Sequence, residues 1–363
     1  MQLISNFDEL LQYFVSNDCH RLFLVHDNAI KYYDEIVKFL NDIVSKGISV
    51  ISFDAFQSNP LYENVVDAVK ICRESNCDGV LAIGGGSAID IAKCVKLWMN
   101  ETDDGSNGKW LVRSNVAEVP FGVVPMTAGT GSEATRYAVI YYEGKKQSVT
   151  NDKILPSVAY LNPRLLRFLP DYQKKSCMLD ALCHGIESLL SINRTVESIE
   201  YSNECLRLIK EHAGEYLAGN EESSYFMLQA SNFGGRAINI TQTTAGHAMS
   251  YKLTSMFGIS HGHAAFLCNI VLFDYMSNFV MFDTQYDLSR LLNDIFIYFD
   301  GFLGCHSIKD VLNCLNLSVP FISDENLKIL VRSVNPDRLK NHPVKLTEQD
   351  FNILYKNIDA LRG

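Results

Sequence analysis

The first 150 residues alternate between short apolar runs and longer segments with helical spacing of apolar positions. A run of four to eight apolar residues is typical of a buried strand, whereas apolar residues three and four positions apart mark one face of a helix. Strands that alternate with helices indicate a doubly wound, parallel α/β sheet. The predicted strands are residues 21–26, 48–53, 79–83 and 121–126, and the predicted helices are residues 31–46, 61–75 and 87–99.

The pattern changes after Pro163. Residues 137–142 and 147–150 flank EGKK and predict a hairpin, and beyond them strand-like runs give way to long helical repeats. A chain of 363 residues usually holds more than one core. We therefore predict a Rossmann-like domain over residues 1–160 and an all-helical domain over residues 161–363, packed around a cleft. Helices are expected at residues 171–191, 196–216 and 224–240, with mostly helical sequence from there to residue 363.

Composition narrows the classes of partner. The formal net charge of −10 argues against nucleic acid, whose binding proteins carry basic surfaces. No apolar stretch approaches the roughly 20 residues that cross a bilayer, and the N-terminus lacks the basic start of a signal peptide. Ten scattered cysteines without a CxxC pair predict reduced thiols and a cytoplasmic protein.

Two loops follow predicted strands and carry small residues. The first contains Gly84, Gly85, Gly86 and Ser87, where glycine allows close approach to a ligand and the next helix begins with free N–H groups. The second, PMTAGTGSE at residues 125–133, offers backbone and hydroxyl groups. A tight structural turn is the alternative for the first loop. Two such loops at the same edge of a sheet favour nucleotide binding.

Asp27 ends the first predicted strand in LVHD. A carboxylate there accepts hydrogen bonds from an adenosine ribose and repels a 2′-phosphate, which favours NAD(H) over NADP(H). The alternative is a capping or turn aspartate.

Candidate metal ligands are found in the second half. Asp180 and His184 are four residues apart on a predicted helix and share one face, and His247 and His261 follow. One carboxylate and three imidazoles suit a first-row divalent ion, with room for a substrate oxygen. His263 is a candidate neighbour of the metal ligands, and Glu187 is interpreted as a charge on the helix face. The remaining histidines are interpreted as core or surface residues: His20, His26, His212, His306 and His342.

Four segments together, GGGSAIDIAK, PMTAGTGSE, DALCHGIE and GHAMSYKLTSMFGISHG, resemble the iron-containing (group III) alcohol dehydrogenase family over almost the whole chain. The resemblance implies metal-dependent, NAD(P)H-linked reduction of a small aldehyde, with iron as the expected metal and zinc as the alternative. It also implies a homodimer or a larger homo-oligomer. The implied metal ligands are Asp180, His184, His247 and His261, and the implied dinucleotide contacts are Gly84, Gly85, Gly86, Ser87, Asp90, Thr127, Thr130 and Lys153.

One position departs from that family. Many members have a second histidine four residues after the third metal ligand, associated with proton relay, and here the residue is Tyr251. Tyr251 either supplies a hydroxyl in its place or shapes the pocket, and His263 is the other candidate catalytic residue. The implied chemistry is polarisation of the aldehyde oxygen by the metal and hydride delivery from the nicotinamide.

RAIN, HAMSYKLTS, HGHA and NPDRLKNHPV resemble, more narrowly, the phosphonoacetaldehyde and sulfoacetaldehyde reductase branch. An acidic protein that reduces an anionic aldehyde needs local cations, and Arg136 and Arg236 are the candidates, since a guanidinium grips a phosphonate bidentately. Surface charges are the alternative for both. The expected substrate is phosphonoacetaldehyde, with sulfoacetaldehyde or an uncharged short-chain aldehyde as alternatives.

Two other functions fit parts of the pattern. A dehydroquinate-synthase-like lyase also uses NAD and a metal, but it needs a basic pocket that the DALCHGIE region lacks, and it recycles its cofactor. A nucleotide-binding regulator would not need four intact metal ligands.

Overall fold

The computed structural model describes residues 1–278 and 287–362 and divides into two compact units, Met1–Leu169 and Pro170–Gly363. The division lies nine residues after the predicted boundary at residue 160. Residues 161–169 belong to the first unit. The Tyr33 hydroxyl donates to the Leu165 carbonyl at 2.7 Å, and Leu165 is buried in the core of that unit.

The first unit contains a six-stranded, fully parallel sheet in the order β1-β8-β5-β4-β2-β3. This confirms the predicted doubly wound α/β class, and the four predicted strands correspond to β2 (Arg21–His26), β3 (Ser49–Phe53), β4 (Gly79–Gly84) and β5 (Phe121–Pro125). The sequence analysis did not identify β1 (Gln2–Ile4) and β8 (Val158–Tyr160), which have three residues each and are too short for a periodic signal.

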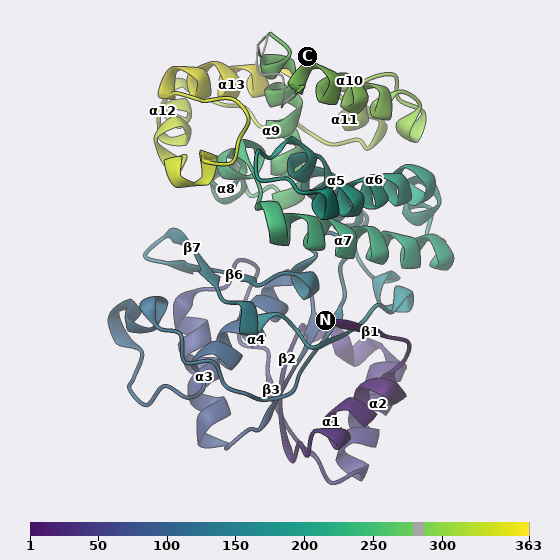
Figure 1. Ribbon diagram of the computed structural model, residues 1–363, viewed down its shortest axis with the longest axis vertical. Coiled ribbons are helices and arrows are strands. Elements are labelled where there is room, and N and C mark those ends of the chain that lie inside the picture. Colours follow the sequence, from purple (N-terminus) through teal and green to yellow (C-terminus); the bar gives the residue numbers. More distant parts are fainter. Residues whose placement is uncertain (279–286, 363) are drawn as a thin grey trace. The chain divides into compact units, whose positions relative to one another are not determined.

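Helices cover both faces of this sheet, as Figure 1 shows within the first unit. Leu22 and Leu24 of β2 pack in a cluster with α1 and α2, whereas Phe23 and Val25 pack in a cluster with α3 and α4. Burial on both faces explains why these strands are continuous apolar runs rather than alternating ones. The helices are α1 (Phe7–Ser16), α2 (Asp34–Ser45), α3 (Tyr62–Glu74) and α4 (Gly86–Trp98).

A separate hairpin follows the sheet. Strands β6 (Tyr137–Tyr142) and β7 (Lys145–Thr150) pair antiparallel around Glu143 and Gly144, which confirms the hairpin predicted around EGKK. Glu143 and Gly144 both have positive φ, the conformation that tight hairpin turns require.

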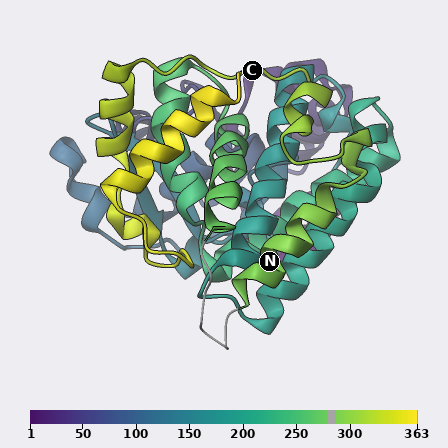
Figure 2. The same ribbon diagram turned by 90° about the horizontal axis from the view of Figure 1, so that it is seen from above.

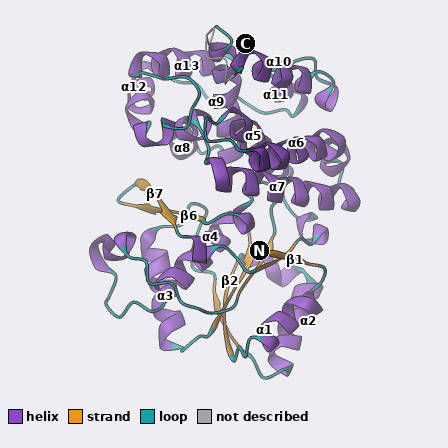
Figure 3. Ribbon diagram, in the orientation of Figure 1, coloured by secondary structure: helices purple, strands orange, loops and turns teal. Residues whose placement is uncertain are grey.

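Helices are the only regular secondary structure in the described part of the second unit. Figure 3 colours them by secondary structure, and Figure 2 shows the chain from above. Helices α5, α6 and α7 pack on one another, and α9 packs on α5 and α8. No helix of the described residues is long and apolar enough to cross a membrane. The helices are α5 (Asp171–Leu190), α6 (Val196–Leu217), α7 (Glu221–Thr241), α8 (Ala245–Phe257), α9 (His261–Met276), α10 (Leu288–Phe299), α11 (Asp310–Cys314), α12 (Asp324–Ser333) and α13 (Glu348–Ala360).

Two of the ten cysteines, Cys305 and Cys314 of the second unit, lie with their sulfur atoms against each other. The reduced state expected of all ten thiols stays a prediction. The other eight cysteines are free, and seven of them are buried.

Candidate metal and nucleotide sites

Three helices of the second unit bring the predicted metal ligands together. Asp180 and His184 lie on α5, His247 lies on the first turn of α8, and His261 is the first residue of α9. The Nε2 atoms of the three imidazoles lie 4.0, 3.4 and 3.9 Å, in that order, from Asp180 Oδ1. Donors of Asp180, His247 and His261, residues up to 81 positions apart, therefore converge, and His184 lies beside Asp180.

The donor set fits a divalent cation. Ligand bonds of about 2.1 Å in a tetrahedron place donors about 3.4 Å apart, close to the distances found here. Donor atoms of Asp180, His247 and His261 all lie within 4.8 Å of one another. Asp180 Oδ1 and His247 Nε2 are buried, and neither has a hydrogen-bond partner among the described residues, as expected of atoms that face a cation.

Glu187, interpreted from the sequence as a charge on the helix face, lies in the interior of the second unit. It is fully buried, and its Oε1 accepts a hydrogen bond from His247 Nδ1 at 2.7 Å. Burial by itself raises the pKa of this carboxyl, but the His247 imidazole and the hydrogen bonds from Asn269 and Thr244 outweigh burial and lower the pKa to about 2. Helical spacing was the available signal, since Glu187 follows His184 by three residues and shares its face.

Tyr251 and Ser250 border the His261 imidazole. The Tyr251 ring lies nearly parallel to that imidazole, with centroids 5.4 Å apart and an angle of 13° between the planes. Ser250 Oγ lies 3.4 Å from His261 Nδ1. A tyrosine at this position therefore lies against a metal-ligand candidate, where the sequence predicted either a proton source or a pocket wall.

His263 has different neighbours. Its ring is buried, its Nδ1 lies 3.1 Å from the Tyr172 hydroxyl, and its backbone N–H donates to Ser176 Oγ at 3.1 Å. Burial lowers the pKa of His263 to about 4. The Tyr172 hydroxyl also accepts from the Ser260 N–H at 2.9 Å, so this contact helps to hold the start of α9.

In the first unit, the two small-residue loops lie side by side. A Cβ built on Gly86 would come within 2.8 Å of Thr130 Cγ2, and one on Gly85 within 3.3 Å of Thr127 Cγ2. Gly85 is the N-cap of α4 and makes no side-chain capping bond, so the helix begins with uncapped N–H groups. That combination suits the phosphates of a dinucleotide.

Asp27 holds the glycine loop in place. Its Oδ2 accepts a hydrogen bond from the Gly85 N–H at 2.7 Å and would lie 2.6 Å from a Cβ on Gly84. Burial raises the pKa of Asp27, and the bond from Gly85 counteracts that effect. Asp27 therefore makes a turn contact, the hydrogen bond from Gly85, as the alternative interpretation of this residue expected. The effect of Asp27 on the choice between NAD(H) and NADP(H) stays a prediction.

Two charged residues of α4 hold the second loop. Asp90 accepts from Ser132 Oγ at 2.7 Å and from the Val139 N–H at 3.0 Å. Lys93, which the sequence analysis missed, is fully buried, and its Nζ lies 2.6 Å from the carbonyls of Ser132 and Tyr137. Burial lowers the Lys93 pKa to about 8, against the opposing effect of the Asp90 charge. The available signal was a lysine three residues after Asp90 within an otherwise apolar helix.

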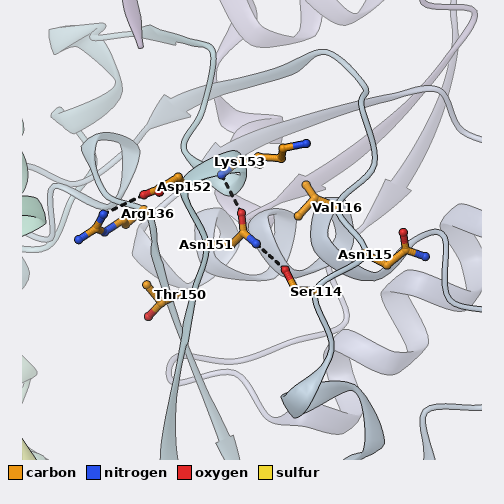
Figure 4. A pocket seen from close by; sticks show the side chains of 8 residues that line it. All are labelled: Ser114, Asn115, Val116, Arg136, Thr150, Asn151, Asp152 and Lys153. Atoms are coloured by element: carbon orange, nitrogen blue, oxygen red, sulfur yellow. Dashed lines mark hydrogen bonds and ion pairs between the residues drawn. The ribbon is translucent and has the colours of Figure 1, made fainter.

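The remaining loop residue, Ser87, accepts a hydrogen bond from the Asn59 N–H at 3.3 Å. Lys153 lies on the surface of the first unit, paired with Glu118 at 2.5 Å. Together with Arg136 it lines a hollow of about 660 Å³, shown in Figure 4. Arg136 itself pairs with Asp152 at 2.8 Å in that hollow.

Arg236 lies on α7 beside aromatic side chains. Its guanidinium is 5.7 Å from the ring of Tyr201, and its Nε donates to Asn232 at 2.9 Å. Gly234 of α7 lies next to His184, since a Cβ built on Gly234 would be 3.3 Å from the His184 Cβ. Arg236 follows Gly234 by two residues, which corresponds to a rotation of about 200° around the helix axis. Arg236 is therefore on a different face of α7 from Gly234.

Comparison with known proteins gives matches to both halves. Residues 4–163 match the family model "Iron-containing alcohol dehydrogenase", and residues 175–294 match "Fe-containing alcohol dehydrogenase family, C-terminal". Alcohol dehydrogenase 4 of Schizosaccharomyces pombe is 26% identical over 343 residues, which cover 90% of this chain and 78% of that protein.

Two further similar proteins carry more specific names. The phosphonoacetaldehyde reductase of Streptomyces viridochromogenes is 34% identical over 224 residues, covering 58% of this chain and 55% of that protein. The structure of sulfoacetaldehyde reductase from Bifidobacterium kashiwanohense in complex with NAD⁺ superposes with a TM-score of 0.84 at 24% identity, covering 99% of this chain and 96% of that one. At that identity the second likeness is evidence for the fold.

Proposed function

This chain belongs to the iron-containing alcohol dehydrogenase family and is an oxidoreductase acting on CH–OH groups with NAD(P), and from that premise we propose that it reduces a short anionic aldehyde with NADH. The convergence of Asp180, His247 and His261 donors carries the proposal. A homodimeric or larger assembly and a cytoplasmic location, both expected from the sequence, belong to the same proposal.

The proposal assigns metal binding to the second unit and dinucleotide binding to the first unit. Asp180, His184, His247 and His261 would hold the metal, and the glycine loop with Thr127 and Thr130 would hold the dinucleotide. When bound, the metal supplies Lewis acidity to the aldehyde oxygen and the nicotinamide supplies hydride. The residues of the chain orient both groups, which lowers the entropic part of the barrier.

Protonation of the product oxygen is assigned to Tyr251. The support is its position beside His261, four residues after His247 on the same helix. His263 is assigned a positioning function through Tyr172 and the start of α9. Iron is the proposed metal, with zinc as the alternative, because one carboxylate and three imidazoles accept either ion.

Replacing a metal ligand tests the centre. His261→Ala should lower kcat/KM by about a thousandfold or more, since the electrostatic contribution of a metal is several kcal/mol. NADH binding, measured by fluorescence titration, should be retained. His306→Ala removes an exposed imidazole of the second unit and serves as the control. Wild-type turnover by the chelated His261→Ala variant would contradict the assignment.

The substrate proposal places phosphonoacetaldehyde ahead of sulfoacetaldehyde. Its support is the 34% identity to a phosphonoacetaldehyde reductase over 224 residues, together with the need of an acidic chain for local cations. Arg136 and Arg236 are the proposed cations. A substrate anion would compete with Asp152 for Arg136, whereas Arg236 has the neutral Asn232 side chain as its described hydrogen-bond partner.

Steady-state kinetics with phosphonoacetaldehyde, sulfoacetaldehyde and propanal tests this proposal. The anionic aldehydes should have the higher kcat/KM, and loss of the contacting arginine in Arg136→Ala or Arg236→Ala should cost about 10- to 100-fold for them alone. Lys252→Ala, which removes a partly buried cation of α8, is the control. If propanal reacts as well as the anionic aldehydes, or neither arginine affects them, the anionic substrate is wrong and the dehydrogenase assignment stands.

A further inference from the structure

The buried carboxylate of Glu187 contacts both the beginning of α8 and the imidazole of His247, a candidate metal ligand. Glu187 Oε2 accepts hydrogen bonds from the backbone N–H and the hydroxyl of Thr244, at 2.6 and 3.1 Å. Thr244 is the N-cap of α8, so the carboxylate lies where the helix dipole favours a negative charge. The other oxygen, Oε1, accepts from His247 Nδ1 at 2.7 Å.

The neighbouring residues leave room for this contact. Asn269 of α9 donates its side-chain N–H to Glu187 Oε1 at 2.8 Å, so three helices meet at the carboxylate. A Cβ on Gly246 would come within 2.6 Å of Glu187 Oε1 and 2.5 Å of the Asn269 amide. Glycine at position 246 is therefore required for Glu187 to reach the first turn of α8.

These contacts determine the tautomer of His247. An ionised carboxylate only accepts hydrogen bonds, so Nδ1 of His247 carries the proton. When a metal binds there, Nε2, the atom 3.4 Å from Asp180 Oδ1, is the nitrogen that supplies a lone pair. With a metal at Nε2, this arrangement would be a carboxylate–histidine–metal triad.

The tautomer of His261 is determined differently. Ser250 Oγ donates its only proton to the His247 carbonyl at 2.9 Å. The hydroxyl can then only accept from His261, whose Nδ1 is 3.4 Å away. Nε2 of His261 is again left with a lone pair, but its support is a longer bond to a neutral acceptor.

We propose that Glu187 and Ser250 are positioning residues that hold the imidazoles of His247 and His261 with Nε2 turned toward the ion, with Glu187 contributing the larger share of the affinity. This inference rests on the metal centre of the proposed function. Because the charged acceptor raises the basicity of its imidazole, removing it costs more than removing the hydroxyl.

Binding of Co²⁺ to the metal-free full-length chain tests the inference without any measurement of turnover. Affinity is measured by competition with a chelator, and the visible d–d absorption of Co²⁺ reports the ligand geometry. Glu187→Gln keeps the size of the side chain and should weaken binding by about 10- to 100-fold. Ser250→Ala should weaken it less, and Ser250→Thr, which keeps the hydroxyl, should restore most of the affinity.

Two further variants keep the inference falsifiable if Glu187→Gln does not fold. Gly246→Ala leaves every candidate metal ligand in the sequence unchanged but displaces the Glu187 carboxylate, so it should weaken Co²⁺ binding as well. Ser202→Ala is the matched control, because Ser202 is a buried serine of α6 whose hydroxyl has no hydrogen-bond partner among the described residues. The control should bind Co²⁺ as the wild type does.

The outcomes separate this inference from the proposed function. If wild type and His261→Ala bind Co²⁺ equally, the metal centre itself is wrong. If wild type binds Co²⁺ tightly but Ser250→Ala and Gly246→Ala match it within error, the centre stands and the positioning assignment is overturned. A loss in Ser202→Ala as large as that in Ser250→Ala would overturn it too.

Discussion

At the scale of single residues, side chains that hold other groups in place matter as much as those expected to touch ligands. Asp27 was considered for its effect on the cofactor, and the structure also gives it a hydrogen bond to the Gly85 N–H. A substitution at Asp27 therefore changes both a charge and the support of the glycine loop. Variants that separate the two effects are needed to interpret its function.

The preference between NADH and NADPH distinguishes the effect of the Asp27 charge from its support of the glycine loop. The wild type should prefer NADH over NADPH, since a carboxylate near a 2′-phosphate is repulsive. Asp27→Asn keeps an oxygen that accepts from Gly85 but removes the charge, so the preference should narrow by about tenfold, mainly through a lower KM for NADPH.

Asp27→Ala removes the acceptor as well and should raise KM for both cofactors. Kinetics with the two cofactors at saturating aldehyde measure these effects. A wild type that strongly prefers NADPH would show that the charge of Asp27 does not determine the choice.

At the scale of elements, α4 connects the two loops proposed to bind the dinucleotide. Its first turn follows the glycine loop, and one turn later Asp90 and Lys93 bind the loop that contains Thr127 and Thr130. Burying an ammonium is costly unless its donors are satisfied, and here carbonyl and hydroxyl oxygens accept from it. The position of the second loop therefore depends on a buried charge of the helix.

Lys93→Met should break this connection. It removes the hydrogen bonds of a buried ammonium and its attraction to the Asp90 carboxylate, so the free energy of unfolding should fall by about 3–5 kcal/mol. For a unit of this size the melting temperature should fall by roughly 6–20 °C, and the Kd for NADH should rise.

Lys96→Met is the matched control for that experiment. Lys96 is a largely buried lysine on the same helix, packed over the Phe121 ring, and its loss should have a small effect. Calorimetry and NADH titration measure both variants. Equal effects of the two substitutions would show that the Lys93 hydrogen bonds are not the cause.

At the scale of the whole molecule, the two sites belong to different units. The donors Asp180, His184, His247 and His261 all lie beyond Pro170, whereas the glycine loop and its neighbours lie before Leu169. Each unit has its own core, so each site is expected to form without the ligand of the other.

Hydrogen–deuterium exchange with each ligand alone tests this independence. Adding the divalent metal should protect peptides of α5, α8 and α9 most strongly, and adding NADH should protect residues 84–90 and 126–135 most strongly. Chelation should abolish turnover while leaving NADH protection in place. Loss of NADH protection on chelation would show that the nucleotide site depends on the metal.

The sequence by itself determined the local features. Apolar periodicity predicted β2 to β5, the hairpin and the long helices, because each depends on residues close together in the chain. The Gly84–Ser87 turn and the histidine spacing likewise indicated the two candidate sites, since the chemistry of those residue types is independent of the fold.

Only the tertiary structure decided which polar residues support those sites. The contact of Glu187 with Thr244 spans 57 positions, and that of Lys93 with Ser132 spans 39. In the sequence, the spacing of Glu187 from His184 indicates a shared helix face but not burial, and β1 and β8 are too short to be recognised. The reason is physical: burial and hydrogen bonding of a charged side chain depend on elements that are distant in the chain, and no local pattern records them.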